Sequence, residues 1–68
     1  MSYQKIRESI ALVTFALNKS GYEAAIVSAQ FLKKTETDDV YEVTYYNDEG
    51  ALETGRVYVN LTTGKGEY

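Results

Sequence analysis

The chain has 68 residues, of which ten are acidic and seven are basic, so its net charge at neutral pH is −3. At this length we expect a single small domain over residues 1–68, which buries only about 60% of the surface of its unfolded chain. The sequence contains neither cysteine nor histidine. Disulfides are therefore excluded, as are most ligand sets for zinc, haem and iron–sulfur clusters. The fold must be held by good packing or by association with another chain.

The hydrophobic fraction is 44% and the charged fraction is 25%, which are ordinary values for a globular domain. The longest apolar run, residues 10–17, contains Thr14 and is too short to cross a bilayer. Lys5 and Arg7 before this run imitate the start of a secretory signal, but residues 18–21 make a poor cleavage site. Together with the absence of cysteine, this predicts a cytoplasmic protein without membrane contact.

Residues 2–19 are predicted to form a helix, with Ser2 as its N-cap and Gly21 closing it in a left-handed conformation. One apolar stripe of this helix has alternating spacings of three and four residues and consists of Tyr3, Ile6, Ile10, Val13 and Leu17. Ile10 and Val13 lie in the middle of the stripe. We therefore expect both at the buried centre of the contact between the helix and a sheet.

Residues 22–34 are compatible with two structures. Residues 20–23 have the spacing of a helical capping box, and the segment after them is rich in alanine, which favours a helix. However, it has no single apolar helical face. As a strand, it would place alternate side chains on one face: Ala25, Val27, Ala29 and Phe31. We expect a strand over residues 24–33 that pairs antiparallel with residues 40–47 through a turn at residues 35–38, and the helix remains the alternative.

Two further strands are predicted at residues 40–47 and 56–61, where β-branched and aromatic residues alternate with polar ones. Gly55 is expected to mark a bulge at the start of the second, and residues 66–68 to add a short edge piece. The side chains expected to point inward are Tyr41, Val43, Tyr45, Val57, Val59 and Leu61. The predicted fold class is α+β, with one N-terminal helix packed on a three-stranded antiparallel meander.

The sequence offers little for catalysis. Histidine and cysteine are absent, and the serines have no base beside them in the sequence. Two acidic pairs, Asp38–Asp39 and Asp48–Glu49, fall in predicted turns, where solvated carboxylates are common. We therefore expect a protein that is not an enzyme and that binds no metal and no cofactor.

Negative charge is concentrated in residues 35–55, which contain seven acidic residues and no basic one. Such a segment is compatible with a surface for a basic partner, or with a mimic of nucleic acid. A meander, however, places the turns near Asp38 and Asp48 at opposite ends of the strand between them, which divides the acids. Nucleic-acid binding is not expected, because no basic groove accompanies the exposed tyrosines.

The helix carries apolar side chains away from its core stripe. Leu12 and Phe15 lie well outside the stripe, and Ala11 lies beside Phe15. We expect these residues to form a partner-binding surface, with Glu8 and Lys19 as its polar rim. A two-fold contact between two copies of the chain is the expected use of this surface. The alternative is that a wide core stripe and the C-terminal residues cover it.

A second apolar surface is predicted on the outer face of the sheet. Tyr46 and Tyr58 should both point away from the helix, joined by Ile26 and Leu32. A small domain with apolar groups on its outward faces usually meets a partner. We therefore count Tyr46 and Tyr58 as further candidate partner-binding residues.

The motif Val-Tyr-Glu-Val at residues 40–43, a turn ending at Gly50, and Val-Tyr-Val-Asn-Leu-Thr-Thr-Gly-Lys at residues 57–65 resemble the second half of a PepSY-type domain. The resemblance covers residues 40–65 in motif and the whole chain in element order. It implies a helix-on-sheet fold and a protein-binding or peptidase-inhibiting role, usually outside the cytoplasm. It implies no catalytic residues.

The function we expect is that of a small non-enzymatic protein-binding module, which acts as an inhibitor, an accessory subunit or a regulator by docking on a protein partner. An alternative is a structural homo-oligomer whose partner is itself, with a homodimer as its expected form. A further alternative is an acidic mimic of nucleic acid.

Overall fold

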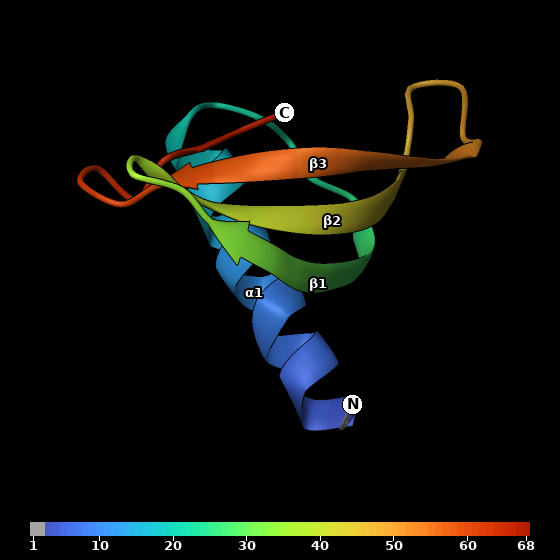
Figure 1. Cartoon of the computed structure of the whole chain (residues 1–68). Coiled ribbons are helices and arrows are strands. Elements are labelled where there is room, and N and C mark those ends of the chain that lie inside the picture. Colours follow the sequence, from blue (N-terminus) through green and yellow to red (C-terminus); the bar gives the residue numbers. More distant parts are fainter. Residues whose placement is uncertain (1–2) are drawn as a thin grey trace.

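One helix lies against one face of an antiparallel sheet in the computed structural model, which describes residues 3–68 (Figure 1). The elements in chain order are α1 (Tyr3–Lys19), β1 (Ile26–Lys34), β2 (Asp38–Tyr46), β3 (Leu52–Asn60) and β4 (Gly66–Glu67). The strands lie in the order β1-β2-β3-β4, and every neighbouring pair is antiparallel. The α+β class and the meander are confirmed, and the edge piece expected at residues 66–68 forms a short fourth strand.

The C-terminal end of α1 is closed by a left-handed glycine, as predicted. Gly21 has a φ of 88°, and its N–H donates to the carbonyl of Asn18 at 3.0 Å. The N–H of Tyr22 donates to the carbonyl of Leu17 at 3.1 Å, which completes a Schellman motif. The predicted N-cap, Ser2, lies outside the described residues.

The buried side of α1 is centred nearer the C-terminal end of the helix than the sequence predicted. Val13, Ala16 and Leu17 are buried, whereas Ile10 is only partly buried and Tyr3 is 75% exposed. The predictions for Tyr3 and for a fully buried Ile10 are therefore wrong, and the one for Val13 is confirmed. The reason is the crossing of helix and sheet, because the N-terminal half of α1 projects beyond the edge strand β1 (Figure 1).

The segment that was compatible with two structures is the strand β1, paired with β2 as expected. It contains two register shifts, one between Ile26 and Ser28 and one between Phe31 and Lys33. The first shift inserts one residue, so Ile26 shares the helix side with Ala29 and packs against the core, while Val27 is exposed. The prediction that Val27 points inward and Ile26 outward is wrong for this reason.

Strand β3 is longer than predicted. It begins at Leu52, and its pairing with β2 continues without a shift to Asn60. Gly55 therefore does not form the expected bulge. It lies opposite Val43, and a β-carbon there would meet the ring of Tyr45 at 3.5 Å. Leu61 was expected to point inward from this strand, but it follows the end of β3 and is exposed.

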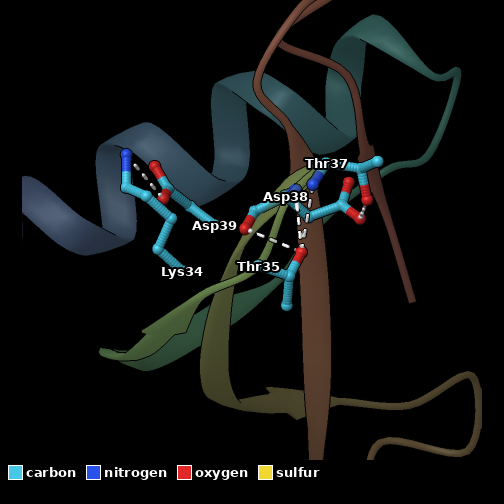
Figure 2. Close-up of polar contacts among 5 residues, drawn as sticks. All are labelled: Lys34, Thr35, Thr37, Asp38 and Asp39. Atoms are coloured by element: carbon cyan, nitrogen blue, oxygen red, sulfur yellow. Dashed lines mark hydrogen bonds and ion pairs between the residues drawn. The ribbon is translucent and has the colours of Figure 1, made fainter.

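The turns are closed by side chains that bond to nearby backbone. In the turn between β1 and β2, the hydroxyl oxygen of Thr35 accepts from the N–H of Asp38 at 3.0 Å (Figure 2). In the next turn, the side-chain oxygen of Asn47 accepts from two N–H groups, those of Glu49 and Ala51, each at 2.9 Å. Asn60 holds the third turn in the same way. These bonds fix where each strand begins and ends.

Candidate functional site

The large apolar side chains lie mostly outside the core. Both phenylalanines and four of the five leucines are exposed, and Leu17 is the buried leucine. The core is built instead from small and branched side chains, chiefly valine and alanine. Because scattered exposed apolar residues are normal, the position of these side chains relative to one another decides whether they form a site.

The first group of exposed apolar side chains lies on one side of α1. Leu12 is 46% exposed and Phe15 is 63% exposed, as the sequence predicted for an isolated subunit. They belong to a row with alternating spacings of three and four residues, which we call the helix flank: Lys5, Glu8, Leu12, Phe15 and Lys19. Ala11, the third predicted helix residue, is also exposed but does not line the hollows described next.

Two hollows follow the helix flank, and Leu12 lines both of them. The first has a volume of about 400 Å³ and is lined by Lys5, Glu8, Ser9, Leu12, Gln30, Phe31 and Tyr41. The second is lined by Leu12, Phe15, Ala16, Lys19, Asp39, Val59, Asn60, Leu61 and Gly64. We call the two together the Leu12 groove. It joins four exposed apolar side chains from three parts of the chain: Leu12, Phe15, Phe31 and Leu61.

Aromatic rings line the first hollow. The rings of Phe31 and Tyr41 meet edge to face, with centroids 5.6 Å apart and planes at 77°. Tyr41 is buried, and this burial together with the charge of Asp39 raises the pKa of its hydroxyl. Phe31 remains about half exposed. This end of the groove therefore offers a fixed aromatic surface to an apolar group.

Charged side chains lie along the groove. Lys34 and Asp39 form an ion pair at 3.5 Å, on the side of the sheet that faces the helix (Figure 2). Asp39 was expected in a turn, but it lies in β2, paired with Lys34 and Val59. The ammonium group of Lys19 lies 4.9 Å from the centre of the Phe15 ring, a cation–π contact. Glu8 accepts from the side-chain amide of Gln4 at 3.4 Å.

The two tyrosines predicted on the outer face do not share a surface. Tyr46 pairs with Leu52 at one end of β2, and Tyr58 pairs with Val40 near the other end. The two positions are six residues apart along β2, which is roughly 20 Å. The polar cross-strand pair of Glu42 and Arg56 lies between them. Both tyrosines are partly exposed, but the structure does not bring them together.

The acidic residues are likewise dispersed. Asp38 begins β2 and Asp48 follows its far end, so the two predicted acidic turns lie at opposite ends of the strand, as expected. Glu53 accepts hydrogen bonds from Tyr45 and Asn47 at 3.1 Å each. Among residues 3–68, no group of three or more acidic side chains is placed to hold a metal ion. In the same part of the chain, no helix is long and apolar enough to cross a membrane.

Comparison with protein-family models found no match, and searches of curated proteins and of solved structures also found none. The resemblance of residues 40–65 to PepSY-type domains therefore stays a prediction.

Sequence reasoning missed two residues of the groove. Phe31 and Leu61 were both expected to point inward, toward the core. A nine-residue strand is about 30 Å long, whereas a helix is only about 10 Å across, so one helix cannot cover the whole inner face. Phe31, on the inner face of the edge strand β1, therefore lines a groove beside the helix instead of the core. Leu61 lines the groove for another reason, because β3 ends at Asn60 and Leu61 lies in the turn that follows.

Proposed function

We propose that this chain is a small non-enzymatic module that binds another protein chain through the Leu12 groove. The observation that carries the proposal is the gathering of Leu12, Phe15, Phe31 and Leu61 around one groove that also holds charged side chains. Fully burying one such side chain is worth about 1.5–3 kcal/mol, so a protein surface that covers the groove recovers free energy that the isolated chain leaves unused.

The dimensions of the groove favour a protein element over a small ligand. The helix flank from Lys5 to Lys19 extends for about 20 Å along α1. A second helix or a strand matches that length, and the charged residues beside the apolar centre give a polar rim to a hydrophobic core, as in protein interfaces. The module would act as an inhibitor, accessory subunit or regulator in the cytoplasm.

Site-specific photo-crosslinking in cells tests this proposal. A photoreactive phenylalanine at position 15 is expected to capture a protein chain, identified by mass spectrometry, and Leu12→Glu in the same chain should reduce that product. The same probe at Tyr46, which is 50% exposed on the other face of the sheet, is the matched control. Equal capture at both positions, or capture at position 46 alone, would show that the Leu12 groove is not the binding surface.

A further inference from the structure

The helix flank is complementary to a copy of itself. Its alternating spacings of three and four residues are those of a seam between two packed helices. When two identical helices pack antiparallel about a two-fold axis that passes between Leu12 and Phe15, Leu12 of each copy faces Phe15 of the other. In the same register, Glu8 of each copy faces Lys19 of the other.

The charges on the helix flank favour this register over the adjacent one, in which the two-fold axis passes through Leu12. With the axis between Leu12 and Phe15, Glu8 and Lys19 bring opposite charges together, and Lys5 faces position 22, beyond the end of α1. With the axis at Leu12 itself, Lys5 of each copy would face Lys19 of the other, and like charges would meet. Complementary charges at the rim of an interface fix its register and disfavour the wrong one.

The hollow beside Leu12 adds a matching shape. Glu8 and Leu12 line the first hollow, and in the favoured register the side chains that face them are Lys19 and Phe15 of the second copy. Phe15 is the more exposed of the two phenylalanines, and the hollow next to Leu12 has aromatic walls from Phe31 and Tyr41. Each copy therefore carries both the projecting ring and the hollow that accepts it. Such self-complementarity is what a two-fold contact requires.

We infer that the occupant of the Leu12 groove is a second copy of this chain, bound through antiparallel α1 helices with Phe15 of each copy in the hollow beside Leu12 of the other. This inference rests on the proposed function and names its partner. Two Glu8–Lys19 pairs, one on each side of the axis, flank the apolar centre. Phe31 and Tyr41 form the wall against which the inserted ring packs.

Charge reversal tests both the partner and the register. Sedimentation equilibrium of the wild-type chain is expected to show a dimer at micromolar concentrations. Glu8→Lys and Lys19→Glu, each alone, replace two attractive pairs by two repulsive ones, which should weaken dimerisation about ten- to hundred-fold. The two substitutions combined in one chain restore opposite charges and should restore the dimer. Glu23→Lys, an exposed change outside the helix that alters the net charge as Glu8→Lys does, is the control for that variant.

The outcomes separate this inference from the proposed function. A wild-type chain that stays monomeric at about 100 µM, but whose position 15 crosslinks to a different protein, would overturn the second copy as occupant and leave the groove as a binding site. A dimer that survives Leu12→Glu and both single reversals would place the contact between copies elsewhere and overturn the second copy as occupant, whereas the crosslinking at position 15 decides the proposed function. A double reversal that fails to restore the dimer, with helical circular dichroism intact, would overturn the register.

Discussion

A β-carbon on Gly66 would lie 3.0 Å from the β-carbon of Ala16, so β4 passes directly under helix α1. The same position is 3.0 Å from the backbone nitrogen of Leu17. This close approach sets the height of the helix over the sheet at the C-terminal half of α1. It also accounts for the burial of Ala16 and Leu17, next to which Leu12 and Phe15 remain partly exposed.

Gly66→Ala is therefore expected to lower the free energy of unfolding by about 1–3 kcal/mol, because the added methyl group meets helix backbone that cannot move away freely. Urea unfolding followed by circular dichroism measures the loss. Gly55→Ala is the matched control, since a β-carbon there would make ordinary contact with Tyr45 at 3.5 Å. Equal losses in the two variants would contradict the close approach of α1 and β4.

The difference in burial between Leu17 and Ile10 predicts different losses of stability when each is replaced by alanine. Leu17 is fully buried, and Leu17→Ala should cost about 2–5 kcal/mol, enough to unfold much of so small a domain. Ile10 is only partly buried, so Ile10→Ala should cost about half as much. Thermal melting of both variants under the same conditions makes the comparison. A larger loss at Ile10 would show that the helix crosses the sheet at a different point.

The elements of this fold could be predicted from the sequence because they depend on local pattern. The helix, the three long strands and their order follow from apolar spacing and from turn residues such as Asn47 and Gly50. The two shifts in β1 could not be predicted, because a bulge depends on pairing with β2 and leaves no distinct signal in the segment itself. One inserted residue exchanged the faces of Ile26 and Val27.

The candidate site was predictable only in part, for a geometric reason. Leu12 and Phe15 stand out by their angle around a helix whose core stripe is visible in the sequence. Phe31 and Leu61 come from segments far apart in the chain. Phe31 lies beside the flank because the helix leaves the edge of the inner face uncovered, and Leu61 because the turn after β3 passes beside α1. Tyr46 and Tyr58 share a face but not a position along it, which depends on the register of β2 and β3.

Alkaline pH should destabilise the fold. The hydrogen bonds that Tyr22 donates to Glu67 and Tyr45 donates to Glu53 raise the pKa of each hydroxyl above its usual value near 10, and burial raises that of Tyr68. The folded protein then holds protons that the unfolded chain has already lost, so the free energy of unfolding falls as pH rises above about 10. Urea unfolding at pH 7, 9, 10 and 11 measures this decline.

Two tyrosine variants test whether Tyr22 and Tyr45 cause the loss of stability at alkaline pH. Tyr22→Phe and Tyr45→Phe each remove a hydroxyl whose pKa is raised in the folded protein. The free energy of unfolding of these variants should therefore fall less steeply with pH than that of the wild-type chain. Tyr3→Phe, at a position 75% exposed near the start of α1, should follow the wild-type curve. If all three variants have the same pH dependence, the contacts of Tyr22 and Tyr45 with their carboxylates do not contribute.

Polar substitutions in the Leu12 groove should abolish association without destabilising the fold. Leu12→Glu combined with Phe15→Ser changes two side chains that are exposed in the isolated subunit, so the free energy of unfolding at low protein concentration should change by less than about 1 kcal/mol. Association should be lost, because the apolar centre of the contact becomes polar. Leu52→Glu is the control, since Leu52 is 55% exposed on the outer face of the sheet. If the double variant unfolds, the two residues belong to the core and the flank is not a surface. If it folds and associates like the Leu52 variant, the contact lies away from α1, and the groove has no part in binding.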